Sequence, residues 1–412
     1  MARILLSAYA CEPCRGSEPG VGWNWAIELA QLGHRVTVLT RSDNRASIDQ
    51  AEGETPPHLS FLYYDLPLRA QWIRRLPGGK PLYYVLWQWL AVRFLRQTLP
   101  QLPFDIVQHV TYVSARFPSF MGSLGIPFIF GPVSGGEAVP ACLRYSFSLS
   151  QQLRERLRDL SNRLIALDPL MRRTFRQASR ILVTPDTLAL IPKRWHHKCE
   201  TRLAIGLTRH DLEACQRRRR RATPPFRLLY VGRLLEWKGL GIALRAINRL
   251  KRSHPDVVFT IIGDGPARSR LMQLSLDPGV LHGVRWTGWL PRSDVEAQYG
   301  AADLLLFPSL RDSGGSVVLE AIAHGLPVIC TDLGGPGVIV DETCGRVVPT
   351  HQLSSAQVAC EMSEALGEIL STPSLLASLS AGARVRARQF AFQDLALSVH
   401  PAPPMRIVSR KA

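Results

Sequence analysis

Two stretches of the chain share one order of elements: an apolar strand, a loop that contains glycine, and an amphipathic helix. In the first stretch, residues 4–8 form an apolar run, and a loop from Cys11 to Gly20 follows. Apolar residues then recur at helical spacing as far as Leu32, and Gly33 ends this predicted helix. The alternating residues 35–40 predict the next strand. This pattern is typical of a βαβ unit.

The second stretch repeats this order in the second half of the chain. It predicts a strand at 226–231, a loop at 232–239, a helix to about residue 252 and a strand at 257–262. Two such openings predict an α/β protein with two parallel-sheet domains of the Rossmann type, whose ligands bind at the carboxyl ends of the strands. A length of 412 residues with 46% apolar composition is sufficient for two cores.

A basic run, residues 216–221, lies between the two stretches and is followed by Ala-Thr-Pro-Pro. Charged residues that end in prolines are typical of a solvated linker, which we favour over a nuclear or nucleic-acid-binding signal. The expected division is an N-terminal domain at 1–205, the basic linker at 206–225, a C-terminal domain at 226–390 and a tail at 391–412.

The most informative segment runs from Pro308 to Cys330. An apolar strand is expected to end at its first residue, and a Gly-Gly loop then leads into a short helix at 317–323. Amides at the start of a helix point outward unpaired and suit a phosphate. Four residues are expected to offer such amides: Gly314, Gly315, Ser316 and Val317. Glu320, one turn inside the helix, can reach a ribose or sugar hydroxyl, and Asp312 can bond loop amides or further hydroxyls.

Asp312 and Glu320, with seven residues between them and His-Gly-Leu-Pro-Val after them, resemble the acidic pair of family 4 (group 1) glycosyltransferases. That family consists of retaining enzymes of the GT-B fold and commonly has Glu at both positions. The resemblance implies an α/β, GT-B architecture in which two Rossmann-like parallel-sheet domains face a cleft. It also implies a catalytic role for Asp312, a donor bound by the C-terminal domain and an acceptor bound by the N-terminal domain.

Two cations follow the first strand of the C-terminal domain. Arg233 and Lys238 stand in Gly-Arg-Leu-Leu-Glu-Trp-Lys-Gly, which resembles the family's G-R-L-x-x-x-K-G element. A diphosphate needs such cations where no metal is used, and the resemblance implies that this pair holds the pyrophosphate. Gly263 and Gly265, in the next turn, are similar to the family's glycine turn beside the nucleotide.

The N-terminal domain holds three further candidates. Gly20 and Gly22 open the first helix but fail as a dinucleotide motif, because Trp25 stands at the third glycine position. We expect them to approach the donor, and a tight turn is the alternative. His109 ends an apolar strand; the residues alone favour a structural histidine, whereas the resemblance implies a catalytic one near the donor sugar. Glu137 is expected on the acceptor side, with a surface acid as the alternative.

The formal net charge of +17 implies an anionic partner, which is a phosphorylated substrate, a membrane surface or nucleic acid. No apolar run is long enough for a transmembrane helix. The aromatic segment 81–92 and the leucine stripe from Leu153 to Leu167 both occur among basic residues, the latter with Arg154, Arg158 and Arg163. We expect each to be a helix that covers a sheet; peripheral contact with an anionic membrane is the alternative.

The eight cysteines are scattered and no signal peptide is evident, so we expect a cytoplasmic protein, or one at the inner face of the membrane. Cys11 and Cys14 lack the second pair that a zinc site needs, and no Asp-x-Asp occurs. We therefore expect no metal and no cofactor, the nucleotide diphosphate sugar being the donor substrate.

These observations predict a metal-independent, retaining glycosyltransferase (hexosyltransferase). It would move a sugar from a nucleotide diphosphate sugar to a hydroxyl of a sugar or lipid-linked acceptor, in polysaccharide or glycolipid synthesis. Three alternatives stay open: a nucleotide-sugar epimerase of the same fold, a basic nucleic-acid-binding protein and a catalytically silent family member. Nucleic acid is not an expected partner, because the arginines are dispersed and no RNA-binding motif interleaves them with aromatics.

Overall fold

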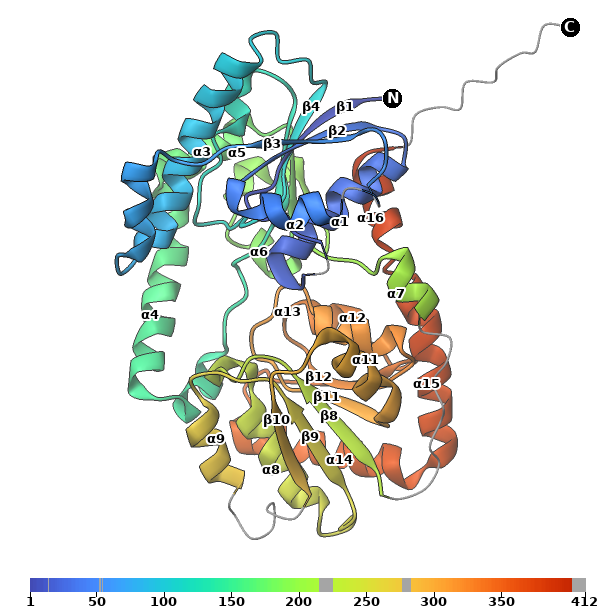
Figure 1. Cartoon of the computed structure of the whole chain (residues 1–412). Coiled ribbons are helices and arrows are strands. Elements are labelled where there is room, and N and C mark those ends of the chain that lie inside the picture. The colour runs from blue at the N-terminus through green and yellow to red at the C-terminus, as the bar shows by residue number, and fades with distance from the viewer. Residues whose placement is uncertain (14, 52, 54, 215–224, 276–282, 402–412) are drawn as a thin grey trace, which may run out of the picture. The chain divides into compact units, whose positions relative to one another are not determined.

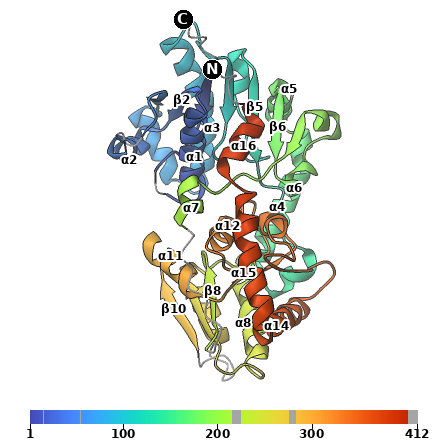
Figure 2. The ribbon, with the colours of Figure 1, turned by 90° about the vertical axis from the view of Figure 1, so that its right-hand side faces the viewer.

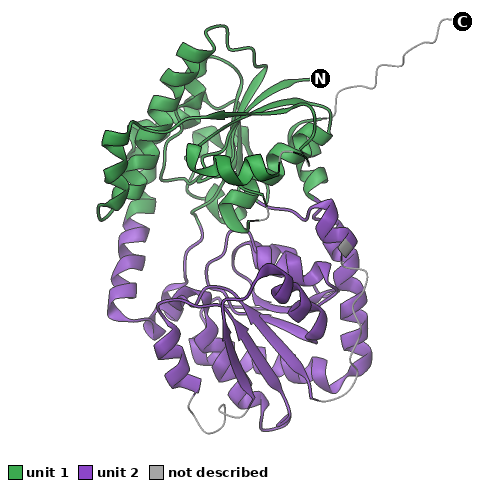
Figure 3. Cartoon of the chain, viewed as in Figure 1, with its two compact units in different colours: residues 1–136, 161–204, 392–412 green, residues 137–160, 205–391 purple. Residues whose placement is uncertain are grey.

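The computed structural model describes residues 1–13, 15–51, 53, 55–214, 225–275 and 283–401 (Figure 1). They form two compact units (Figure 3). Unit 1 contains residues 1–136, 161–204 and the residues from 392 onward, and unit 2 contains residues 137–160 and 205–391. This division differs from the continuous ranges expected from the sequence. Half of the predicted basic linker (215–224), Cys14 and the end of the predicted tail lie outside the described residues.

Unit 1 is built on a seven-stranded sheet in the order β3-β2-β1-β4-β5-β6-β7, with parallel neighbours. The inner strands are buried because helices cover both faces, and the two edge strands are partly exposed. The strands are β1 (Arg3–Ser7), β2 (Arg35–Thr40), β3 (Leu59–Tyr63), β4 (Ile106–His109), β5 (Phe128–Val133), β6 (Arg180–Val183) and β7 (Cys199–Thr201). The helices are α1 (Ser17–Gln31), α2 (Arg45–Gln50), α3 (Gly79–Thr98), α5 (Pro169–Gln177), α6 (Pro185–Leu188) and α16 (Phe392–Val399).

Unit 2 is built on a six-stranded sheet in the order β10-β9-β8-β11-β12-β13, again with parallel neighbours. The strands are β8 (Arg227–Val231), β9 (Val258–Ile262), β10 (Val284–Gly288), β11 (Leu304–Phe307), β12 (Val328–Thr331) and β13 (Gly345–Val348). The helices are α7 (Arg209–Ala214), α8 (Leu240–Leu250), α9 (Arg268–Ser275), α11 (Arg292–Ala301), α12 (Ser316–Ala323), α13 (Gly334–Ile339), α14 (Ser355–Ser371) and α15 (Pro373–Arg388). The expectation of two Rossmann-like parallel-sheet domains is confirmed.

The residues after 391 are not simply a tail. Helix α16 returns to unit 1 and lies beside α1, as both views show (Figures 1 and 2). The Phe392 ring packs edge-on against the buried Trp25 ring, 5.4 Å between centroids. Arg180 donates to the main-chain oxygen of Val399 at 2.7 Å. Because these contacts join residues more than 200 positions apart, the local sequence pattern gives no sign of them.

The two apolar segments of the sequence behave differently. Helix α3 buries Tyr83, Trp87 and Leu95 in the core of unit 1, so it covers the sheet as expected. Helix α4 (Leu149–Leu164), which begins in unit 2 and ends in unit 1, does the opposite. The five leucines of the predicted stripe are between 50% and 64% exposed: Leu153, Leu157, Leu160, Leu164 and Leu167. The expectation that this stripe covers a sheet is therefore wrong.

No helix among the described residues has the length and apolar character needed to cross a membrane.

Candidate active site

The strand order of unit 2 fixes where a ligand binds. From β8 the chain adds β9 and β10 on one side, and it then crosses over to add β11, β12 and β13 on the other. The loops that follow β8 and β11 therefore diverge at the carboxyl edge of the sheet, and this is the point at which open α/β sheets bind ligands. Lys238 belongs to the first of these loops and Asp312 to the second.

Lys238 and Asp312 meet at this point. Lys238 Nζ lies 2.5 Å from Asp312 Oδ2, and both side chains are largely buried. The other carboxylate oxygen, Oδ1, accepts from the amides of Gly315 at 2.8 Å and Gly314 at 3.2 Å. The expectation that Asp312 can bond loop amides is thus confirmed. Two of the four amides predicted to hold phosphate face the Asp312 carboxylate, so this point of unit 2 gathers donors around an anion.

Gly315 is required by the backbone at this point. It is the N-cap of α12 with φ +69°, a left-handed conformation that glycine adopts without strain. A Cβ here would also lie 2.7 Å from Ile339 Cδ1. Gly315 has no side chain that could cap the helix. Helix α12 begins at Ser316, one residue before the predicted start.

Glu320 lies in the second turn of α12 and is half-buried. The Tyr299 hydroxyl, from α11, donates to its Oε2 at 2.9 Å. Burial raises the pKa of the Glu320 carboxyl, although the Tyr299 hydrogen bond and the charge of Arg292 act in the other direction. Arg292 in turn lies 3.0 Å from Asp211 of α7. Neither Tyr299 nor Arg292 stands in a motif, so neither was predicted as a partner of Glu320.

Arg233 and the two glycines of the next turn complete this edge. The Arg233 side chain is exposed. A Cβ on Gly263 would lie 2.0 Å from the Gly232 oxygen, and one on Gly265 would lie 2.5 Å from the Leu234 oxygen. These glycines therefore let the loop after β9 pack directly on the loop that carries Arg233.

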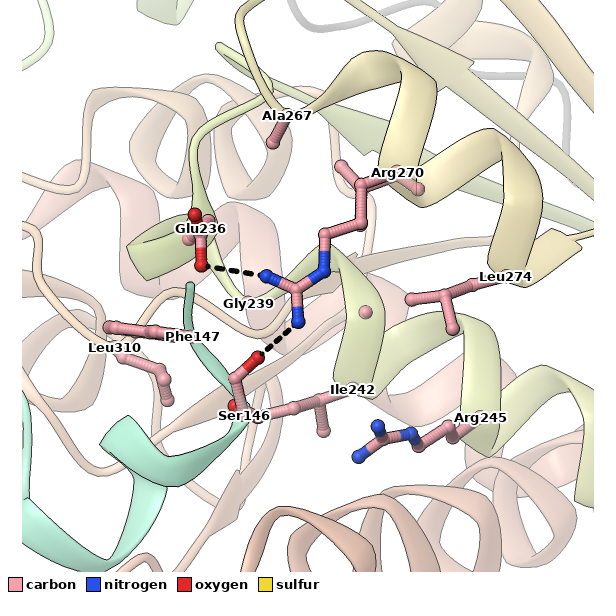
Figure 4. A pocket seen from close by; sticks show the side chains of 12 residues that line it. Ser146, Phe147, Glu236, Gly239, Ile242, Arg245, Ala267, Arg270, Leu274 and Leu310 are labelled. Carbon is pink, nitrogen blue, oxygen red and sulfur yellow. Dashed lines mark hydrogen bonds and ion pairs between the residues drawn. The ribbon is translucent and has the colours of Figure 1, made fainter. Parts of the chain in front are cut away.

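The far side of the loop that carries Lys238 is anchored by the segment 137–160. Glu236 accepts from the Ser148 amide at 2.6 Å and from Arg270 Nη1 at 3.1 Å. Arg270 also donates to the Ser146 oxygen at 2.8 Å, so its guanidinium spans the two (Figure 4). These residues line a small hollow of about 80 Å³. Glu236 and Arg270, which the sequence did not single out, thus fix the position of the loop.

Glu137 was expected on the acceptor side, and the structure groups it with unit 2. It is buried, and its main-chain oxygen accepts from Arg158 Nη2 at 3.1 Å. The alternative of an exposed surface acid is therefore wrong, and its expected role stays a prediction.

Unit 1 has its own point of divergence between β1 and β4, and His109 ends β4 there. The ring is fully buried, with the Gln88 amide nitrogen 2.8 Å and the Tyr84 hydroxyl 3.0 Å from its Nε2. Burial lowers the pKa of His109 to about 3, so the ring is neutral at pH 7. These contacts favour a structural role for the ring, and the predicted catalytic role stays a prediction.

Gly20 and Gly22 lie inside α1, whereas the sequence predicted that the loop continues to Gly20. The helix begins at Ser17, four residues earlier than predicted. A Cβ on Gly22 would lie 2.2 Å from the Ala10 oxygen and 3.1 Å from Thr111 Cγ2, so this glycine lets α1 approach the loop after β1 and the segment after His109. A Cβ on Gly20 would lie 2.0 Å from the Arg15 oxygen. The packing of the helix accounts for both glycines.

The start of α1 is tied to the segment after His109. Glu18 Oε2 accepts from the Tyr112 amide at 2.7 Å. Ser17 and Tyr112 both have positive φ values, +62° and +57°, which are strained for these residue types. Burial raises the pKa of Glu18, while the hydrogen bond from Tyr112 lowers it. Such strain is typical of functional sites, and the sequence gave no sign of this contact between residues 94 positions apart.

Among the residues that the structure describes, no three His, Cys, Asp or Glu side chains come together as a metal site requires.

Comparison with known proteins identifies the family. Residues 213–385 match the family model described as glycosyl transferases group 1, and residues 17–191 match a glycosyl transferase 4-like domain. The chain belongs to the group 1 glycosyltransferases of the GT-B fold.

Relatives and solved structures agree with this assignment. The 2-deoxystreptamine glucosyltransferase of Streptomyces kanamyceticus is 32% identical over 162 residues, which are 39% of this chain and 41% of that protein. This chain therefore matches less than half the length of that curated relative. Among solved structures, sucrose-phosphate synthase from Thermosynechococcus elongatus has a TM-score of 0.62 at 19% identity, covering 97% of each chain. HepE from Anabaena, in complex with UDP and glucose, has a TM-score of 0.56 at 15% identity, covering 97% of this chain and 98% of that one. At these identities the structural likeness shows the fold.

Proposed function

We propose that this protein transfers a sugar from a nucleotide diphosphate sugar to an acceptor hydroxyl, with retention at the anomeric carbon and without a metal. The observation that carries the proposal is the group of donors at the β8/β11 divergence: Lys238, the amides of Gly314 and Gly315, and the exposed Arg233 on the same loop as Lys238. Cations and helix-start amides stabilise a diphosphate leaving group where no divalent ion does.

In this mechanism the bond between the anomeric carbon and the phosphate oxygen breaks while the acceptor oxygen attacks from the same face. The departing phosphate takes the proton of the acceptor hydroxyl. Arg233 and Lys238 stabilise the charge on the leaving diphosphate. Glu320 binds the ribose, and the hydrogen bond from the Tyr299 hydroxyl orients its carboxylate for this contact. Since the His109 ring is turned into the core, His109 acts through its main-chain carbonyl.

We also propose that an anionic membrane is a partner, contacted through α4. The polar side of this helix points inward: Glu155 pairs with Arg311 at 2.7 Å, and Asp159 pairs with Arg144 at 2.5 Å. The opposite side exposes the leucine stripe. Arg156 and Arg163, seven residues apart and hence two turns apart, lie on that same side and are exposed. The exposed face of α4 thus presents leucines and arginines, while its acidic residues pair on the inward side. Such a face fits an anionic lipid surface.

A calorimetric experiment tests the donor site. UDP and a panel of nucleotide sugars are titrated into the wild type, Arg233→Ala and Arg252→Ala. Losing one charge-assisted contact at Arg233 should weaken binding by roughly 1.5–3 kcal/mol. Arg252, also exposed but just before β9 at the amino edge of the sheet, is the matched control and should have no effect. Unchanged affinity in Arg233→Ala would remove this residue from the site.

Turnover of the donor should also persist in EDTA, because side-chain cations and amides take the place of a divalent ion. Loss of turnover on chelation, restored by magnesium, would contradict the metal-independent mechanism. Product analysis without acceptor separates a transferase from an epimerase, since only the epimerase converts its nucleotide sugar into an isomer.

A further inference from the structure

A hollow of about 400 Å³ opens on unit 1 at the amino edge of its sheet. Its walls are the last turns of α3, the last turn of α5 and the short η4 helix (Met121–Leu124), which lead into β4, β6 and β5 respectively. His109 ends β4 at the carboxyl edge, so the hollow lies at the other end of these strands. Its volume is within the range of small-molecule sites, roughly 300–1,000 Å³.

Three arginines line this hollow: Arg93, Arg96 and Arg173. No carboxylate is among the lining residues, and no ion pair between described residues involves any of the three. All three are exposed, so water screens their mutual repulsion in part, and an anion bound among them removes what remains. The planar fork of arginine matches the oxygens of a phosphate.

The hollow is built by regular elements. Trp89, Arg93 and Arg96 are four and three residues apart on α3, so they lie on one side of that helix. The Arg93 guanidinium lies over the Trp89 ring, 5.7 Å from its centroid. Arg96 donates to the Ser123 oxygen of η4. These contacts hold two of the three cations in place.

The lining also contains a neutral amide side chain. Gln177, four residues after Arg173 on α5, also lines the hollow. Its side-chain oxygen is buried and has no hydrogen-bond partner among the described residues. Gly122 packs tightly against it, since a Cβ there would lie 2.7 Å from Gln177 Cβ. The oxygen has almost no accessible surface, so a ligand hydroxyl can pair with it only when the Gln177 side chain turns toward the hollow, where the three arginines hold an anionic group.

We propose that this hollow binds a phosphate ester with a free hydroxyl. The phosphate accepts from the arginines, and the hydroxyl donates to the Gln177 oxygen. Such a group occurs in a soluble polyol or sugar phosphate and in the headgroup of phosphatidylglycerol. The site belongs to unit 1 and uses none of the residues that bind the donor diphosphate in unit 2.

Calorimetry tests this proposal in the presence of saturating UDP, so that the donor site does not take up the probe. Glycerol 3-phosphate should bind more tightly than inorganic phosphate, because only the ester carries an alcohol hydroxyl several bonds away from the phosphate that the arginines hold. Arg93→Gln with Arg173→Gln should weaken glycerol 3-phosphate at least about tenfold, as expected for the loss of charge-assisted contacts. Arg35→Gln with Arg45→Gln removes the same charge from exposed arginines of unit 1 and should have no effect.

A second arm uses vesicles of phosphatidylglycerol in phosphatidylcholine, with the wild type and the same two double variants. If the lipid headgroup is the ligand, the double variant of the hollow should bind these vesicles less than the control double variant. Weaker binding of either source in the hollow variant supports the proposal. The proposal is overturned if the hollow variant and the control variant bind glycerol 3-phosphate equally well and also bind the vesicles equally well. Titration with UDP alone should give wild-type affinity in both variants, whatever the outcome at the hollow.

Discussion

The Asp312 carboxylate occupies the donors that a diphosphate needs. It pairs with Lys238 and accepts from the amides of Gly314 and Gly315. A second anion that enters here has to share or displace these bonds. The family commonly has Glu at this position, and the shorter Asp stays close to its own loop. We therefore expect Asp312 to order the loop and to weaken the binding of free nucleotide.

The substitution Asp312→Asn tests this dual role. It keeps an acceptor oxygen for the loop amides and removes the charge, so UDP should bind more tightly by roughly 1 kcal/mol or more. Glu368→Gln, which removes an exposed carboxylate of unit 2 paired with Arg346, is the matched control. Calorimetry measures both. Weaker UDP binding in Asp312→Asn would show instead that the carboxylate itself supports the ligand.

The buried His109 makes the stability of unit 1 depend on pH. Its pKa is lowered to about 3, and that of the buried His400 likewise, because burial disfavours the charged rings. Below pH 6.5 the unfolded chain binds protons that the folded rings do not, so stability falls as the pH falls. The free energy of unfolding should drop by about 2 kcal/mol per histidine between pH 6.5 and pH 5.

Urea unfolding at pH 7, 6 and 5 measures this dependence. His109→Gln should show a smaller loss of stability than the wild type over this range. His58→Gln, at an exposed position, should keep the wild-type dependence. Equal pH dependence in all three proteins would mean that His109 does not stay neutral in the folded state.

At the scale of elements, the sequence predicted several strands well, because their apolar runs are largely buried. Glycine or proline follows β8, β9 and β11 directly, at Gly232, Gly263 and Pro308. β2 was predicted to the residue, and β8 and β9 to within one residue. The start of α1 was predicted four residues too late. Ser-Glu-Pro-Gly resembles a loop, but proline is compatible with the first turn of a helix, and the bond between Glu18 and Tyr112 belongs to the tertiary structure.

Gly22 provides the test of how closely α1 packs. A methyl group in Gly22→Ala would lie 2.2 Å from the Ala10 oxygen and would have to displace the helix. We expect the free energy of unfolding to fall by about 1–3 kcal/mol. Gly300, inside α11, has nothing within 4 Å of its ideal Cβ. Gly300→Ala should therefore be neutral or stabilise by up to about 1 kcal/mol, through helix propensity. Urea unfolding of both variants makes the comparison, and equal effects would contradict the close approach.

At the scale of the whole molecule, the chain does not divide where its composition changes. Residues 137–160 belong to unit 2, where Glu155 pairs with Arg311 and Ser148 donates to Glu236. Helix α16 belongs to unit 1, where it contacts Trp25 and Arg180. The candidate site was predictable as motifs at strand ends. The partners that orient it, such as Tyr299 and Glu236, were not, because each lies far in sequence from the group it contacts.

The outward leucines of α4 lead to the prediction for the whole molecule. The protein should float with vesicles that contain anionic lipid, should not float with neutral vesicles, and should detach as salt rises, since each basic residue near an anionic leaflet contributes about 1 kcal/mol that salt screens. Arg156→Glu with Arg163→Glu should prevent flotation, and Leu153→Gln with Leu157→Gln should weaken it at every salt concentration, because the leucines act through apolar burial. The sequence alone pointed to Arg154, Arg158 and Arg163, and the structure adds Arg156. Arg158 donates to the Glu137 main-chain oxygen, so it is left unchanged.

Val385→Gln, at another exposed apolar position, is the matched control and should float like the wild type. UDP binding should be the same in all these variants, because none of the changed residues contacts the donors at Lys238. Flotation of the wild type with neutral vesicles would show that charge does not govern the contact. A wild type that stays unbound with anionic vesicles at low salt would contradict membrane binding through α4, and the exposed leucines would then require a protein partner.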